Sequence, residues 1–539
     1  MAVITSNFFG YLNPGRRFTS LGGLATLVVT LAIIPLLFVI YNSLQLSASQ
    51  WSGLWSSRLP GLLQNTISLA ALVSIGCVTL GVSAAWWVCR REFPGRKLAV
   101  WLMVLPLTIP TYVFAHIYTS LLEQDGWLGK LWILITGNAS SIPDVYNIWG
   151  VTLVLSLAGF SYVFLLARTS LSQSTQTLEE AARIQGASPM DVFRRVNLPL
   201  LRPAIAAGLA IVVLHVLSDF GAVSMLHFQT FTLSIYLQMS GRFDYQAAAG
   251  LSMILVMLSF TFLVLERFFR QRQQYYSTRN TRQQPIRQAT NFETFMIWLW
   301  LGFITLLAFG LPMAWMLSWS WEAWTQGLIN NEFWGYAGNS LLVAVIAATL
   351  AVFAGLPVAF YNARRRSFGS QALLQLSSVG FVLPGPVIAL GILSVLLAQL
   401  PFLYGGLAAL VIAIVIRFLP LAVQSQDAAM AQLTPSVEQV GRSLGAGPLE
   451  NLRRVVLPMI RGGMATAWVL VFIDTLKELP ATLILRPTGF DTLPVRIWIE
   501  ASEEMLELAA PAALMLVIGT LPVLWVMMNK NATTTLSSS

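Results

Sequence analysis

The sequence has few charged residues. Asp, Glu, Lys and Arg make up only 10% of its 539 residues, whereas 56% are hydrophobic. An ordinary soluble domain has about 25% charged residues. The excess of apolar residues therefore needs lipid as a second solvent, and a bilayer core takes about 20 apolar residues per helix. We expect an all-α, polytopic membrane protein.

Motifs that mark many enzymes and metalloproteins are missing. There is no GxxxxGK[ST] phosphate loop, so this chain is not expected to hydrolyse ATP by itself, and there is no HExxH motif. Cys77 and Cys89 fall in one apolar run, which favours two buried thiols over a disulfide or a metal pair. His116, His215 and His227 are scattered, which argues against a metal cage. The sequence predicts no catalytic residues, no cofactor and no metal site.

The basic residues occupy alternate connections between apolar runs. Although the formal net charge is +9, this spacing is typical of cytoplasmic loops and not of nucleic-acid binding. The acidic connections alternate with the basic ones, so both termini are expected in the cytoplasm. Twelve runs are expected to span the membrane: 21–44, 62–88, 98–121, 146–167, 202–220, 246–268, 294–318, 339–360, 371–398, 403–423, 460–480 and 508–528.

An internal repeat divides the chain into two halves. The segment TLEEAARIQGASPMDVFRRVNLPLLRPAIAAG begins at Thr177, and the related SVEQVGRSLGAGPLENLRRVVLPMIRGGMATA begins at Ser436, 259 residues later. Asn65 in QNTISLAAL similarly resembles Asn339 in GNSLLVAV. We expect parallel six-helix repeats at 1–270 and 293–530. A cytoplasmic linker is expected at 271–292 and a disordered polar tail at 531–539.

Ionisable residues inside membrane spans are costly, so they are functional candidates. Asp219 and Glu478 occupy matching repeat positions, and Asp474 is about one turn from both Lys477 and Glu478. Arg417 lies inside an expected span and could contact carboxylates in the bundle. Two interpretations stay open: an acidic passage for a cation, or polar contacts that hold helices together.

Each repeated segment is expected to form a short cytoplasmic helix pair. It has a helix-friendly acidic start, a glycine at which a helix can bend, and a Leu-Pro pair before the next span. Such a piece could transmit force from a soluble partner to the bundle. The residues are Glu180, Ala181, Ala182, Gly186, Leu198 and Pro199 in the first copy, and Glu438, Gly445, Leu457 and Pro458 in the second.

The first copy closely resembles the EAA motif of binding-protein-dependent ABC importer permeases. That resemblance implies a coupling loop that docks on an ATPase subunit. The second copy departs from the motif, with Gln439, Val440 and Gly441 at the Glu-Ala-Ala positions, which puts equal docking strength in doubt. The segment from Lys477 to Pro487, followed by Phe490–Leu493, is similar to the ferric-iron importer branch, as are Asp219–Gly221 with Thr230–Thr232.

The resemblance implies a fused permease in a bacterial inner membrane. Its expected partners are a cytoplasmic ABC ATPase dimer, a periplasmic substrate-binding protein and membrane lipid. Ferric iron is the expected substrate. A permease for thiamine or another small nutrient is the first alternative, and a secondary transporter is the second.

Overall fold

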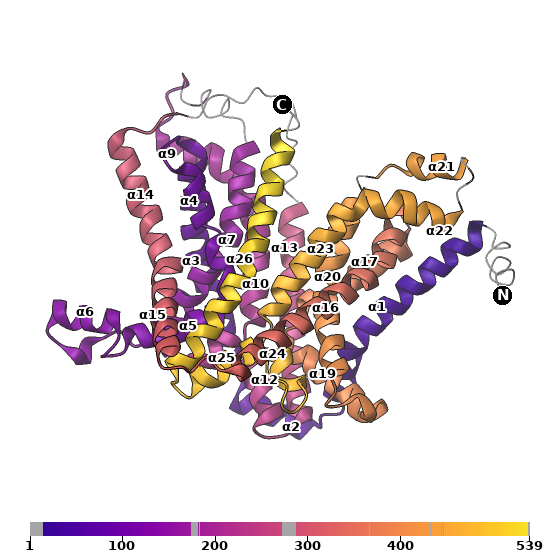
Figure 1. Cartoon of the computed structure of the whole chain (residues 1–539), viewed down its shortest axis with the longest axis horizontal. Coiled ribbons are helices and arrows are strands. Elements are labelled where there is room, and N and C mark those ends of the chain that lie inside the picture. The colour runs from indigo at the N-terminus through magenta and orange to yellow at the C-terminus, as the bar shows by residue number, and fades with distance from the viewer. Residues whose placement is uncertain are drawn as a thin grey trace. The chain divides into compact units, whose positions relative to one another are not determined.

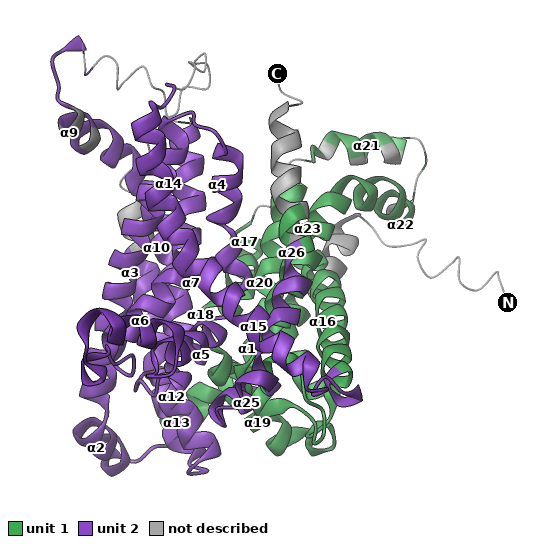
Figure 2. Cartoon of the chain, turned by 60° about the vertical axis from the view of Figure 1, so that its left-hand side comes forward, with its two compact units in different colours: residues 1–45, 334–495, 522–539 green, residues 46–333, 496–521 purple. Residues whose placement is uncertain are grey.

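The structure is a computed structural model that describes residues 14–173, 182, 184–271, 287–365, 367–431, 433–443, 445 and 447–536 (Figure 1). This part of the chain is helical, and its one extended contact is an isolated bridge between Glu92 and Gln288. The all-α prediction is therefore confirmed. The residues form two compact units, each of which is described by itself below (Figure 2).

The first unit comprises residues 1–45, 334–495 and 522–539. Its helices are α1 (Pro14–Leu44), α16 (Asn331–Arg364), α17 (Phe368–Ser377), α18 (Val379–Val382), α19 (Gly385–Gln399), η5 (Pro401–Leu403), α20 (Leu407–Ala431), α21 (Pro435–Ser443), α22 (Pro448–Asn451), η6 (Leu452–Val456), α23 (Leu457–Leu476) and α24 (Pro480–Leu485). It also holds the end of α26 (Leu506–Leu536).

The second unit comprises residues 46–333 and 496–521. It begins with α2 (Ala48–Ser57), α3 (Leu59–Arg90), α4 (Arg96–Leu102), η1 (Leu105–Thr108), α5 (Thr111–Leu122), α6 (Trp127–Thr136), η2 (Ala139–Ser141) and α7 (Ile148–Gln173). It continues with α9 (Pro189–Val192), η3 (Phe193–Asn197), α10 (Leu198–Ser218), α11 (Gly221–Met225), α12 (Phe231–Ser240), α13 (Tyr245–Gln271), α14 (Asn291–Thr305), η4 (Leu306–Gly310), α15 (Leu311–Thr325) and most of α25 (Leu493–Ser502).

The described residues include nine unbroken helical segments long and apolar enough to cross a membrane. Two bent helix pairs and the shorter apolar helix 506–522 cover the remaining expected runs. The runs expected at 98–121 and 371–398 are present as helix pairs, and each pair breaks sharply. The segment 96–108 meets 111–136 at 95°, and 368–381 meets 385–399 at 105°.

Proline accounts for both breaks. Pro110 immediately precedes α5, and Pro384 immediately precedes α19; both have extended backbone conformations, with ψ of 150° and 149°. A proline has no amide hydrogen to continue the preceding helix. The two breaks place the first residues of α5 and α19, Thr111 and Gly385, at the same point of the two repeats.

The compact units do not follow the boundaries expected for the repeats. Helix α1 packs with second-repeat helices, and Gly391 of α19 lies against Pro35 so closely that an added Cβ atom would be 2.5 Å from the Pro35 carbonyl oxygen. Helices α14 and α15 pack with the first repeat, where the Trp315 indole donates to Ser120 at 3.1 Å. The repeat limits at 1–270 and 293–530 remain a prediction from sequence.

Small residues allow the long helices within each unit to approach closely. A Cβ atom at Gly81 of α3 would be 2.8 Å from the Phe160 carbonyl oxygen of α7. At the repeat-equivalent Gly355 of α16, an added Cβ atom would be 2.9 Å from the side-chain oxygen of Gln426 in α20. Small residues commonly permit such backbone approach in membrane helix packing.

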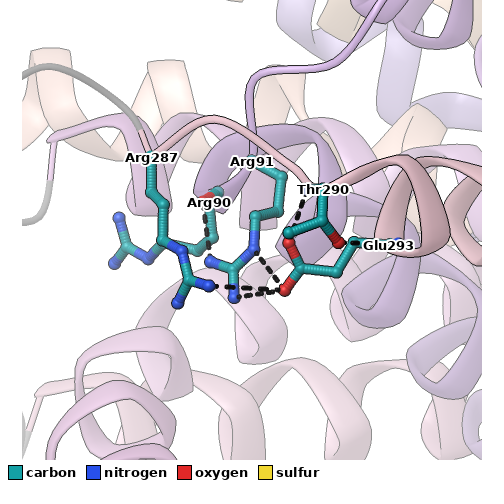
Figure 3. A network of polar contacts seen from close by, with 5 residues as sticks. All are labelled: Arg90, Arg91, Arg287, Thr290 and Glu293. Carbon is teal, nitrogen blue, oxygen red and sulfur yellow. Dashed lines mark hydrogen bonds and ion pairs between the residues drawn. The ribbon is translucent and has the colours of Figure 1, made fainter.

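The end of the expected linker is attached to the first repeat. The Glu92 amide donates to Arg287, and the Ala289 amide donates back to Glu92, both at 2.9 Å. Figure 3 shows Arg91 and Arg287 directed at Glu293, at 3.5 and 3.8 Å. Helix α14 begins at Asn291, and residues 272–286 lie outside the described residues. The linker at 271–292 stays a prediction from sequence.

The last described helix extends into the C-terminal segment. Helix α26 continues to Leu536, and the disordered tail expected at 531–539 stays a prediction from sequence. Residues 537–539 lie outside the described part of the chain.

Candidate functional site

The two repeated segments have the same backbone signature. Gly186 and Gly445 both adopt the left-handed conformation, with φ of 83° and 85°. An L residue with a side chain resists that region, which explains glycine at both positions. Nothing lies within 4 Å of a Cβ atom added at either position, so backbone conformation and not crowding selects glycine.

The residues around these glycines are only partly described. Ala182 is helical, and its carbonyl oxygen accepts the Ala187 amide at 3.0 Å. Glu438 lies within α21. Glu180 and Ala181 lie outside the described residues, so the structure leaves the Glu-Ala-Ala part of the motif untested.

A short helix, a π turn and a Leu-Pro helix start follow each glycine. Helix α9 leads through η3 into α10, and α22 leads through η6 into α23. Pro199 and Pro458 lie in the first turns of α10 and α23, where a missing amide hydrogen costs nothing. The sequence predicted the proline starts but not the π turns.

Each short helix has an acid–arginine pair one turn apart. Asp191 lies 3.6 Å from Arg195, and Glu450 lies 2.9 Å from Arg454. The hydrogen bond from the Ser188 hydroxyl, together with Arg195, lowers the pKa of Asp191. The two arginine side chains are 82% and 78% exposed, so both segments present a positive surface that a partner could contact.

A hydrophobic cluster joins the second repeated segment to its bundle. Met430 and Leu433, at and after the end of α20, are buried with Val456 and Ile460, and partly buried Val437 of α21 packs against them. Other partly buried members are Leu356, Phe360, Ala363, Ala429, Leu452, Leu457 and Met464. Because these side chains pack against one another, a displacement of α21 and η6 would push directly on α16, α20 and α23.

Asp219 lies at the junction of α10 and α11. Its Oδ1 atom accepts the amides of Ala222 and Val223 at 3.0 and 3.3 Å, and its Oδ2 atom accepts the Thr111 hydroxyl at 2.6 Å. The residue is 7% exposed. This carboxylate caps one short helix and fastens the broken span at its second segment, because Thr111 is the first residue of α5.

Glu478 occupies the corresponding junction of α23 and α24. Its Oε1 atom accepts the Ala481 amide at 2.9 Å, and its Oε2 atom lies 3.2 Å from Nε of Arg417. Glu478 is 4% exposed. The expected contact between Arg417 and a carboxylate in the bundle is thus present.

Asp219 and Glu478 are bonded to donors from different helices of the two repeats, Thr111 of α5 in the first and Arg417 of α20 in the second. In the first repeat the N-terminal residue of α5 is Thr111, and the position of α7 that is equivalent to Arg417 is the buried Ala158. In the second repeat the N-terminal residue of α19 is Gly385, and the Arg417 guanidinium occupies the space that a side chain there would need. The side chain that donates to the carboxylate therefore comes from the helix after the break in the first repeat, and from the next long helix in the second.

A second matched contact lies close by in sequence. The Asn65 amide donates to the Gln229 carbonyl oxygen at 3.0 Å, and the Asn339 amide donates to that of Asp491 at 2.9 Å. Each asparagine fastens the loop that precedes α12 or α25. The sequence paired these asparagines, but it gave no sign of their partners.

The remaining acidic candidates make a separate pair. Asp474 lies 3.6 Å from Lys477, as the helical spacing suggested. Within the described residues no group of three His, Cys, Asp or Glu side chains could hold a metal ion. Cys77 and Cys89 are buried free thiols that donate to the carbonyl oxygens of Ser156 and Arg168 at 3.7 and 3.6 Å.

Comparison with known proteins defines the class. Residues 77–274 and 351–529 match the family described as "Binding-protein-dependent transport system inner membrane component". The chain belongs to this family and is a multi-pass permease of an ABC importer. The family is the inner-membrane component of such systems and lacks an ATPase domain.

Individual relatives carry more specific names. The chain is 30% identical to the Fe(3+)-transport system permease protein FbpB 2 of Haemophilus influenzae. The aligned 490 residues cover 90% of this chain and 93% of that protein. It is 23% identical to the ferric transport system permease protein FbpB of Actinobacillus pleuropneumoniae over 79% of this chain and 64% of that protein. The sulfate transport system permease protein CysT of Salmonella typhimurium is 28% identical over 45% of this chain and 88% of its own length.

Proposed function

We propose that this chain moves ferric iron across a bacterial inner membrane. The observation that carries the proposal is similarity over nearly the full length of both chains to a protein named for Fe(3+) transport. The sulfate-named relative matches less than half of this chain, in keeping with a protein that holds one repeat. The signature segments after Asp219 and Lys477 point the same way.

The proposed complex has two further components. A delivery protein outside the membrane brings the iron, and two copies of an ATPase grip the segments around Gly186 and Gly445. The matched left-handed glycines, π turns and exposed arginines support two docking points of similar shape. The hydrophobic cluster around Met430 and Val456 would carry ATP-driven movement from one of them into the bundle.

The proposed orientation places both termini and both docking segments in the cytoplasm. This orientation puts the exposed arginines of the two segments on the cytoplasmic side, in keeping with the positive-inside rule. The connection that ends at Glu332 then faces outward.

Iron selectivity is assigned to the delivery protein. Ferric iron is a hard cation that prefers oxygen ligands, and tight binding inside the path would slow release. Asp219 and Glu478 are proposed to line a weak acidic passage when the path opens. In the described conformation both are buried and bonded, which suits a closed state.

Uptake of labelled substrates tests the proposal. The gene would be deleted in cells that lack other iron routes, and uptake of iron, sulfate and thiamine would be measured. Selective loss of iron uptake, restored by the intact gene, is expected. Loss of sulfate or thiamine uptake with normal iron uptake would refute the substrate and leave the permease class intact.

A further inference from the structure

An open cavity with charged, polar and apolar lining residues lies at one end of the second unit. Its volume is about 610 Å³, and its lining includes Arg58, Asn65, Gln229 and Arg242, together with Leu62 and Leu237. Pockets for small ligands commonly have volumes of about 300–1,000 Å³. The size therefore suits an entire polar group, and not only a trapped water molecule.

The cavity is positively charged. None of the described residues that line it is acidic, and neither guanidinium forms an ion pair within the described part of the chain. Arg58 is half-buried and Arg242 is exposed, so the charge stays accessible to a ligand. Guanidinium groups bind carboxylate and phosphate oxygens with matching geometry.

The wall of the cavity is fixed by the matched asparagine contact. Asn65 of α3 holds the Gln229 carbonyl oxygen at 3.0 Å, and the Ser234 hydroxyl reaches the Gln229 side chain at 3.5 Å. These two hydrogen bonds connect α3 to the start of α12, beside Arg58 and Arg242. Such fastening reduces the ordering that a ligand would otherwise have to impose.

The position of the cavity separates it from the ATPase-coupling segment. Helices α2 and α12 lie at one end of the second unit, and α9 lies at the opposite end (Figures 1 and 2). Arg58 precedes α3, whereas Arg90 ends this helix and Arg91 follows it. In the proposed orientation the cavity opens outward.

The second repeat carries the opposite charge at the corresponding places. Residue Glu332 lies in the first turn of α16, where Arg58 precedes α3. Glu503 and Glu504 follow α25, where Gly241 and Arg242 follow α12. A partner that meets both repeats would therefore be attracted in one orientation and repelled in the exchanged one.

We propose that this cavity binds an oxyanion, a carboxylate or phosphate-like group, through Arg58 and Arg242. Two arginines repel a metal cation, so the site is separate from the cation path. The oxyanion comes either from an acidic side chain of the delivery protein or from a small free anion. Binding of an acidic side chain of the delivery protein rests on the proposed function, whereas binding of a small free anion does not.

Binding measurements on the permease purified with its ATPase test the site. Titration with sodium phosphate or citrate at low salt, followed by calorimetry, reports a free-anion ligand. Association with the delivery protein required for uptake, followed on a biosensor, reports an acidic side chain. The variant Arg58→Gln/Arg242→Gln should weaken the interaction that the unaltered protein makes, with the free anion or with the delivery protein, at least about tenfold. The reason is that charged hydrogen bonds are lost.

The control is Lys130→Gln, which removes an exposed cation of the same unit outside the cavity. It should leave both interactions within about twofold, since single exposed charges contribute little. Equal thermal unfolding of all variants will show that folding is unchanged. If the double arginine variant binds phosphate, citrate and the delivery protein as the unaltered protein does, the oxyanion site is refuted. The phosphate and citrate titrations stand even if the substrate proves not to be iron.

Discussion

The Arg417 guanidinium lies directly over Gly385, in the space that any larger residue would need. From there its Nε atom reaches Glu478 at 3.2 Å. In the first repeat the same task falls to Thr111, whose hydroxyl reaches Asp219 at 2.6 Å. A side chain at 385 would displace Arg417 and would also press on Pro480, whose Cγ atom would lie 2.6 Å from an added Cβ atom.

The first prediction follows from that exchange. Gly385→Thr should displace Arg417 and break the buried pair, at a cost of about 3–5 kcal/mol in stability. Adding Arg417→Ala should recover at least about 1 kcal/mol, because the new threonine hydroxyl can take over the carboxylate. Unfolding of the three variants in detergent measures the coupling. Strictly additive losses would contradict the exchange.

The second prediction concerns the two carboxylates. Glu478→Gln should destabilise the protein by about 3–5 kcal/mol, because Arg417 would be left buried without its counter-charge. Asp219→Asn should cost only about 1–2 kcal/mol, because an amide oxygen can still accept the amides of α11. Thermal unfolding of both single variants decides the order. Equal losses would mean that the charge on Arg417 adds nothing.

The third prediction concerns Gly186 and Gly445. Alanine at either position should cost about 1–2 kcal/mol, because the backbone is left-handed there. Asparagine, which tolerates that region better, is the matched control and should cost less. Uptake per ATP hydrolysed should fall with alanine, and more so at Gly186 because its copy retains Glu-Ala-Ala. Normal uptake in both alanine variants, at equal membrane levels, would argue against the coupling role.

The fourth prediction concerns orientation. A cysteine introduced as Asn330→Cys should react with an impermeant maleimide from outside, whereas Arg365→Cys should react only after the membrane is opened. Both original residues are exposed, and the native thiols of Cys77 and Cys89 are buried, so the background should be low. The reverse pattern of labelling would invert the proposed topology.

The sequence predicted those features that depend on local chemistry. The spans follow from apolar runs, and the Gly186 and Gly445 bends follow from the tolerance of glycine for left-handed backbone. The Asp474–Lys477 pair follows from helical spacing. The glycine bends and the ion pair are decided within about one helical turn, and each span within one run of about 20 residues, so a single sequence contains the necessary information.

Other features depend on contacts between distant segments. Pro110 and Pro384 were visible, but whether a proline bends or breaks a span depends on what satisfies the freed backbone groups. Here α5 and α19 are secured by Thr111–Asp219 and by Arg417 over Gly385, which are far apart in sequence. The packing of α1 with the second repeat likewise depends on the fit of Gly391 against Pro35.

The most direct test of the whole account is ATP-driven iron uptake in a reconstituted system. Proteoliposomes would contain the permease and its ATPase, with the iron-loaded delivery protein on the accessible outer face and ATP inside. The unaltered protein should take up labelled ferric iron only with ATP, and Gly186→Glu/Gly445→Glu should abolish that uptake. Uptake that continues without ATP, or at the normal rate in this double variant, would contradict an ATP-coupled permease that acts through these two segments.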